Sequence, residues 1–179
     1  MKEAAALVAL DGINSRALRA EARKVLANAR GRRGGVSVWD ASGLFEELAF
    51  AGGETGLPSA RALLLLYAAD LAFRLRWEIR PALEEGRVVI AAPYVETAVA
   101  FGRAAGLPRR WLRDLFAFAL PAAQWRHVDA TPASGSSRRD GFVEFGLKWM
   151  HRAPSRREMM TSVRRQLRAR QAKDRKRHV

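Results

Sequence analysis

The sequence of 179 residues predicts an α/β fold with a parallel sheet of about four to five strands flanked by helices. Short apolar runs alternate along the chain with segments whose apolar residues recur at helical spacing. Each run is apolar at nearly every position, which is typical of strands buried on both faces, as in parallel sheets. The length fits one domain, at about 150 residues per domain.

The runs expected as strands are residues 4–10, 36–39, 87–92 and 124–129. We expect Asp11-Gly12 to end the first of them. Helices are expected over residues 15–30, 42–50, 58–85, 95–105 and 108–119, and again from residue 141, with the last turns (164–179) frayed. Ser15 is a suitable N-cap for the first helix, Pro81 should kink or restart the long one, and Gly86 should end it.

Several classes of site are excluded by composition. The chain has no Cys, so disulfides, thiolate metal sites and cysteine nucleophiles are absent. Its three His residues lie far apart in sequence, and we expect no metal site. No apolar run reaches about 18 residues, so no membrane span is expected. The N-terminus carries acidic residues too early for a secretory signal, which favours a cytoplasmic protein.

Positive charge is concentrated at the C-terminal end. The net charge is +14, and residues 138–179 hold 14 of the 32 basic residues but 4 of the 18 acidic ones. This predicts a nearly balanced α/β body over 1–137 and a basic helical segment over 138–179 with a flexible tail. Such a helix can bind nucleic acid, an acidic protein or an anionic membrane surface, or simply be solvated, and GC-rich codon usage is an alternative source of its arginines. The candidate binding residues on it are Arg156, Arg157, Arg164, Arg165 and Arg168.

The centre of the chain resembles the thymidylate kinase family, the P-loop enzymes that phosphorylate dTMP. The resemblance rests on LLLLYAAD (63–70), IRPALEEGRVVI (79–90), Tyr94 with AVAF (98–101), and GLPRRWL (106–112), in the order and spacing of that family. It covers about a third of the chain well. It implies the P-loop nucleoside monophosphate kinase fold, with ATP and Mg²⁺ as cofactors of an active member, and pairing of two copies through the 62–73 helix.

The phosphate motif departs from the family pattern. A P-loop needs G-x-x-x-x-G-K-[ST], in which glycines, Lys and a hydroxyl hold the phosphates and Mg²⁺. The corresponding stretch, residues 9–16, keeps Asp11 and Gly12, but has Asn14 for the last glycine, Ser15 for the Lys and Arg16 for the hydroxyl. The resemblance therefore implies at most weak nucleotide or anion binding at this helix N-terminus.

Two further phosphate motifs are also altered. The family's Asp-Arg-Tyr reads Ala92-Pro93-Tyr94, which removes a carboxylate and an arginine. The Arg-Glu-Pro-Gly-Gly motif reads as residues 39–43, WDASG, without its arginine.

The base site keeps part of its pattern. Tyr67 stands at the aromatic stacking position, although a core role is the alternative. The next arginine is Leu71 and the glutamine at the helix end is Gly102, while Arg74 lies one turn on. The remnant base site is thus Tyr67 with Asp70, Arg74 and Tyr94.

These changes predict a degenerate active site. Losing one charge-stabilising group in a phosphoryl-transfer site costs on the order of 10³-fold. We therefore expect no catalytic residue and no cofactor, and a binding or scaffold role toward nucleic acid or protein. The alternative is a divergent nucleotide kinase that acts on a monophosphate such as dTMP, with Arg16 or Arg19 for the Lys and Asp11 or Asp70 on Mg²⁺. A new acidic site from Asp11, Glu21, Asp40 and Asp70 is the least favoured interpretation.

Overall fold

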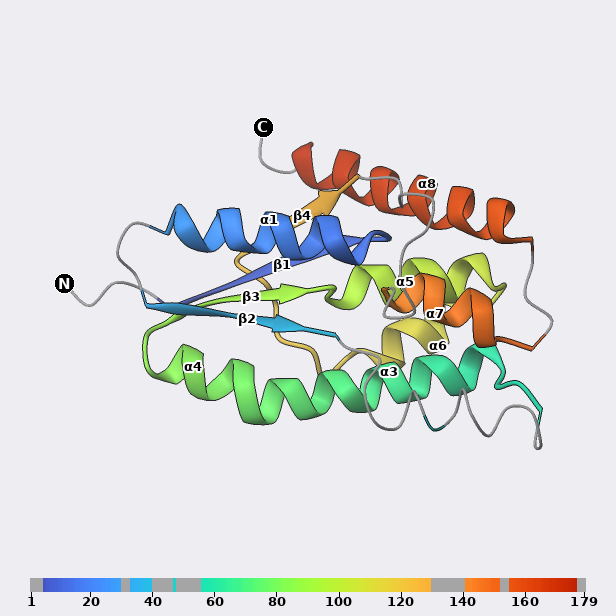
Figure 1. Cartoon of the computed structure of the whole chain (residues 1–179), viewed down its shortest axis with the longest axis horizontal. Helices are drawn as coiled ribbons and strands as arrows, with labels where there is room; N and C mark the ends of the chain where they lie inside the picture. Colours follow the sequence, from blue (N-terminus) through green and yellow to red (C-terminus); the bar gives the residue numbers. More distant parts are fainter. Residues whose placement is uncertain are drawn as a thin grey trace.

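A four-stranded parallel sheet forms the centre of the molecule (Figure 1). The computed structural model describes residues 5–29, 33–39, 47, 56–129, 141–151 and 155–176. The strands are β1 (Ala6–Gly12), β2 (Gly34–Val38), β3 (Val88–Ala92) and β4 (Gln124–Val128), in the order β2-β3-β1-β4. All three neighbouring pairs are parallel, so the α/β class and the strand number expected from the sequence are confirmed.

Helices cover both faces of the sheet. Their bounds are α1 (Ser15–Ala27), α3 (Ala60–Arg74), the π-helical segment η1 (Leu75–Ile79), α4 (Arg80–Glu84), α5 (Val95–Ala104), α6 (Arg109–Leu115), α7 (Phe142–Trp149) and α8 (Arg156–Arg175). Val8 and Leu10 of β1 pack on the α1 side, while Leu7 and Ala9 face the side of α3, α5, α7 and α8. Burial on both sides explains why the strand runs are solidly apolar.

The long helical rod α3–η1–α4 changes register just before its proline. The π-helical segment occupies Leu75–Ile79, and Pro81 then stands in the first turn of α4. A proline has no N–H to donate and crowds the preceding turn, and the wider π turn accommodates this without breaking the rod. Gly86, at φ +80°, ends the rod, as the sequence predicts.

Several local expectations differ from the structure. α6 ends at Leu115, short of the expected 119, and the helix expected from residue 141 is two helices, α7 and α8, with extended backbone at Met150 after the first. β1 continues through Asp11 and Gly12 instead of stopping there, because the Asp11 carboxylate finds partners inside the protein. Asn14, not Ser15, is the N-cap of α1, since its Oδ1 accepts from the Ala17 N–H at 2.9 Å. α8 stays helical to Arg175, beyond the fraying expected from residue 164. The helix expected over 42–50 lies outside the described residues apart from residue 47.

The C-terminal helices belong to the same core as the sheet. Met159, Val163 and Leu167 of α8 are buried at i, i+4 and i+8, and they join the cluster that contains Leu7 and Val89. These three residues form the buried stripe of the otherwise basic helix. Within the described ranges, no helix is long and apolar enough to cross a membrane.

Candidate functional site

The carboxylate of Asp11 lies at the carboxyl end of β1, where parallel α/β sheets place their ligand sites. It is fully buried and has four donors. Oδ1 accepts from the backbone N–H groups of Tyr94 (3.0 Å) and Thr97 (2.8 Å) and from the Thr97 hydroxyl (2.7 Å). Oδ2 accepts from Trp125 Nε1 at 2.8 Å. The side chain therefore joins β1 to the start of α5 and to β4.

Burial raises the pKa of Asp11, and its hydrogen bonds with Thr97, Trp125 and Tyr94 partly offset that rise. A carboxylate with four protein donors has little capacity left for a metal ion. The donor set therefore does not fit the Mg²⁺ role that the sequence offered Asp11.

The phosphate-loop region is held by contacts within the protein. Gly12 lies so close to β4 that an added Cβ would stand 2.6 Å from the Val128 carbonyl oxygen. The Asn14 side chain already accepts one of the first N–H groups of α1. Gly141, just before α7, lies over the loop, where its Cβ would be 3.1 Å from the Ile13 oxygen. Of the remaining candidates here, Ser15 is half-buried and Arg16 is exposed.

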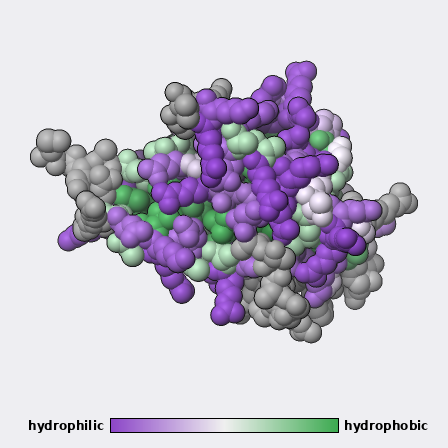
Figure 2. Space-filling model, turned by 90° about the horizontal axis from the view of Figure 1, so that it is seen from above, coloured by the Kyte–Doolittle hydropathy of each residue, from purple (hydrophilic) through white to green (hydrophobic). Residues whose placement is uncertain are grey.

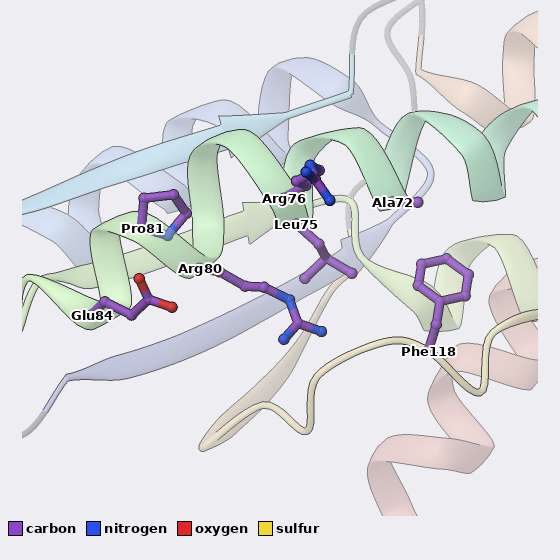
Figure 3. Close-up of a pocket in the computed structure, with 7 residues that line it drawn as sticks. All are labelled: Ala72, Leu75, Arg76, Arg80, Pro81, Glu84 and Phe118. Atoms are coloured by element: carbon purple, nitrogen blue, oxygen red, sulfur yellow. The ribbon is translucent and has the colours of Figure 1, made fainter.

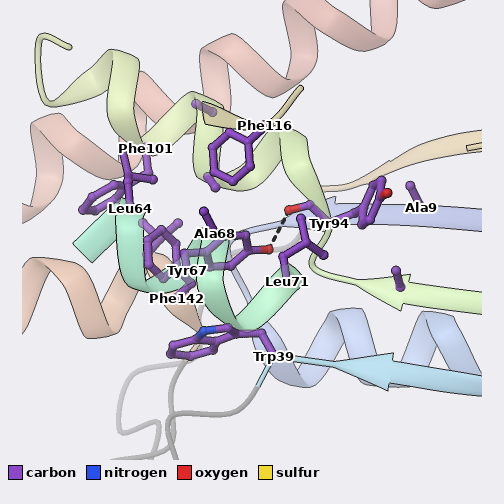
Figure 4. Packing of buried hydrophobic residues seen from close by; sticks show 14 of the residues in the cluster. Ala9, Trp39, Leu64, Tyr67, Ala68, Leu71, Tyr94, Phe101, Phe116 and Phe142 are labelled. Carbon is purple, nitrogen blue, oxygen red and sulfur yellow. Dashed lines mark hydrogen bonds between the residues drawn. The ribbon is translucent and has the colours of Figure 1, made fainter. Parts of the chain in front are cut away.

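The ring of Tyr67 is fully buried in an aromatic cluster (Figure 4). Its hydroxyl donates to the Tyr94 carbonyl oxygen at 2.6 Å. Its ring centroid lies 4.5 Å from that of Phe142, the first residue of α7. The ring centroids of Trp39 and Phe101 lie 5.7 and 5.1 Å from that of Phe142. Phe142 is thus a direct neighbour of the ring on which the resemblance would have a base stack.

Tyr94, the last residue of the remnant base site, also serves the core. Its side chain is buried, and its hydroxyl donates to the Leu120 carbonyl oxygen at 2.8 Å. Burial raises the pKa of Tyr94 to about 12. Burial likewise raises the pKa of Tyr67 far above its ordinary value, so both phenols remain protonated donors.

The guanidinium of Arg74 is the exception among the remnant base-site residues. The residue is 3% exposed, and its Nε donates to Asp70 Oδ2 at 2.8 Å. Both of its terminal nitrogens are buried and have no hydrogen-bond partner. Each buried donor without an acceptor lowers the stability of the fold by about 1–3 kcal/mol. A ligand oxygen that accepted a hydrogen bond from these nitrogens would recover part of that loss.

The basic residues of α8 fall into two groups. The first group forms ion pairs with acids of the body: Arg156 with Glu144, Arg164 and Arg168 with Asp129, and Arg170 with Glu96. The second group, Arg157, Arg165, Lys173 and Arg175, is exposed and has no acidic partner among the described residues. Figure 2 looks down on the side of the molecule that carries α1 and α8, and hydrophilic side chains cover most of it.

The structure does not bring the candidate acids together. Glu21 Oε2 lies 4.0 Å from Lys24 Nζ, and Asp70 forms an ion pair with Arg74. Asp40 is outside the described residues. Among the described residues, no group of three or more metal-binding side chains occurs. Sequence reasoning missed Thr97, Trp125 and Phe142, whose roles depend on contacts across 75 to 114 residues of chain and carry no local motif.

The comparisons with known proteins agree with this fold. The parallel sheet with helices on both faces is an α/β fold of the P-loop kinase-like type. The solved structure of thymidylate kinase from Ehrlichia chaffeensis matches 96% of this chain and 89% of its own, with a TM-score of 0.65 and 13% identity. No protein-family model matches the chain.

Sequence relatives point to the same kinases. Proteins named probable thymidylate kinase from Staphylothermus marinus and Thermococcus gammatolerans are 36% identical over 77 residues and 40% over 82 residues. Each match covers 43% of this chain and 39% of the relative, so the chain aligns with about two fifths of their length. Within its class, the chain is thymidylate kinase-like, and the resemblance found in the sequence is confirmed.

Replacing Gly12 with Ala should destabilise the protein. The new methyl group would meet the backbone of β4, which cannot rotate away, and overpacking of this kind costs about 1–3 kcal/mol. Gly35→Ala on β2 is the matched control, because nothing lies within 4 Å of its added Cβ. Urea unfolding measures both, and equal stabilities of the two variants would contradict the close contact.

Asp11→Asn should alter the pH dependence of stability. The folded-state pKa of Asp11 lies above its ordinary value of 3.8, so the folded state holds this proton more tightly than the unfolded state. Its contribution to the free energy of unfolding is greatest below that ordinary value and is lost as pH rises through the folded pKa. Asn does not titrate and leaves Trp125 facing an amide donor. In urea unfolding, the wild-type protein should have a higher free energy of unfolding than Asp11→Asn at acid pH, and this difference should shrink toward neutral pH. A difference that grows toward neutral pH would contradict a raised pKa of Asp11.

Proposed function

We propose that this protein is a catalytically degenerate, thymidylate kinase-like binding module that engages nucleic acid through its basic C-terminal segment. The observation that carries the proposal is the contact between Phe142 and Tyr67. The ring of Phe142 lies against the aromatic residue on which the resemblance implies that a base stacks. A nucleoside cannot share that position unless α7 leaves the core.

The residues at the phosphate end support the same conclusion. ATP with Mg²⁺ requires a lysine, a hydroxyl and a free carboxylate near the loop before α1. Here Ser15 and Arg16 stand at the lysine and hydroxyl positions, and the carboxylate of Asp11 is already bound by four donors. The residues present do not fit the metal–nucleotide group, and we derive no step of phosphoryl transfer from them.

A protein partner is also proposed, in the form of a second copy bound at the outer face of α3 and η1. Phe73 and Trp77 are each 61% exposed on this face, and Leu65 is 53% exposed. Beside them lies a hollow of about 490 Å³ between the rod and Phe118 (Figure 3). Large exposed side chains gathered on one helix face are typical of an interface, and the resemblance implies pairing through this helix.

A divergent nucleotide kinase is the second candidate function, and the buried guanidinium of Arg74 is the observation that favours it. Its two terminal nitrogens lack acceptors, and a ligand carbonyl or phosphate oxygen would satisfy them. Such a ligand would have to displace Phe142 or enter beside it.

Calorimetric titration with ATP and dTMP, each with and without Mg²⁺, separates the two functions. The degenerate module should show no Mg²⁺-dependent heat with either nucleotide at millimolar ligand. Micromolar, Mg²⁺-dependent binding of ATP would overturn the proposal in favour of a kinase. If dTMP alone binds, Arg74→Met should abolish the heat, whereas Arg76→Met, on the exposed side of the same rod, should not.

Sedimentation velocity tests the paired form. The wild-type protein should sediment as a dimer at micromolar concentration, and Trp77→Glu should give the monomer, because a charge would be buried in the interface. Thr161→Glu, at an exposed position of α8, is the charge-matched control and should leave the dimer intact. A wild-type protein that stays monomeric up to high concentration would remove this part of the proposal.

A further inference from the structure

Three arginines surround a hollow between α8 and the corner where α5 turns into α6. The hollow measures about 560 Å³ and is lined by Arg103, Arg109 and Arg165, with Ser162 and Gln166. Each arginine comes from a different part of the chain: Arg103 from the last turn of α5, Arg109 from the start of α6, and Arg165 from the middle of α8. No acidic side chain lines the hollow.

The backbone that carries these arginines is held in place. Gly106, at φ +81°, reverses the chain after α5, and the Leu107 N–H bonds to the Gly102 carbonyl oxygen at 2.9 Å. This turn brings the start of α6 beside Arg103. On the other side, the buried stripe of α8 fixes Arg165 against α5. The three positive charges are thus brought together by packing.

The arginines of the hollow differ from their neighbours in pairing. None of Arg103, Arg109 and Arg165 has an ion pair or hydrogen bond with an acidic side chain among the described residues. Burial raises the pKa of Glu96, and the charges of Arg170 and, more weakly, Arg103 oppose that rise; the ion pair of Glu96 is with Arg170 at 3.1 Å. The guanidinium groups around the hollow therefore repel one another, and an anion between them would relieve that repulsion.

The neutral side chains of the hollow add a donor. Ser162 Oγ accepts from Gln166 Nε2 at 3.4 Å, and its own proton has no acceptor within the described part of the chain. Guanidinium forks and hydroxyl groups are the side chains that bind phosphate oxygens. We infer that Arg103, Arg109 and Arg165, with Ser162, form a phosphate-binding site.

This inference deepens the proposed function. The identification of nucleic acid as the ligand of the site rests on that proposed function. The inference assigns the phosphate contacts to Arg165 and not to the arginines of α8 that form ion pairs with Asp129 and Glu96. Of the candidates on the basic helix, Arg165 is the one that belongs to the site, and Arg103 and Arg109 join it from the kinase-like body.

The full chain is tested with two probes: a fluorescent 20-nucleotide single strand, by anisotropy across a salt series, and inorganic pyrophosphate, by calorimetry. The site variant is Arg103→Ala/Arg109→Ala/Arg165→Ala. The control, Arg23→Ala/Arg33→Ala/Arg126→Ala, loses the same charge from exposed positions elsewhere. Circular dichroism establishes that both variants are folded.

The site variant should bind the oligonucleotide at least about tenfold more weakly than the control, with a salt slope smaller by about 2, because three phosphate contacts are lost. If the oligonucleotide does not bind but pyrophosphate does, and only the site variant loses it, the site stands and the nucleic-acid function fails. Equal loss in both variants, or no binding of either probe to the wild type, overturns the site.

Discussion

A buried carboxylate with four donors holds the carboxyl end of the sheet together. Asp11 belongs to the central strand, and its partners come from the start of α5 and from β4, the strand on its other side. Taking a charge out of water is costly, and it is tolerated here because every contact offers a hydrogen bond. Strand, helix and neighbouring strand are therefore positioned by one side chain, and the shape of everything above this edge depends on it.

The same edge explains the character of the candidate site. In α/β sheets the carboxyl ends of the strands leave a crevice in which ligands bind. Here Phe142 enters that space from α7, and Trp39, Tyr67 and Phe101 pack around it. Aromatic burial of this kind contributes stability where a ligand site would leave an opening. At this edge the aromatic side chains form a packed core, and among the remnant base-site residues Arg74 keeps buried terminal nitrogens that lack acceptors.

Much of the fold could be predicted from the sequence, because strands buried on both faces are short apolar runs that stand out between helical patterns. All four strands lie within two residues of their expected bounds. The π-helical segment could not be foreseen, since nothing in its composition separates it from α-helix. The site was harder still. Burial of Asp11 depends on Thr97 and Trp125, 86 and 114 residues away, and the arginines of α8 find acids whose positions only the packing of the helix determines.

The core that α7 and α8 share with the sheet determines what would follow if the backbone were cut before α7. Residues 141–176 supply Phe142, Val143, Phe145 and the buried stripe of α8 to the cluster that covers one face of the sheet. A break in the backbone between residues 130 and 140 would consequently yield two fragments that stay associated, each burying apolar surface that it cannot cover alone. Residues 141–176, about a fifth of the chain, are thus a complementing piece of the body, and the basic helix is fixed to that body by its buried stripe.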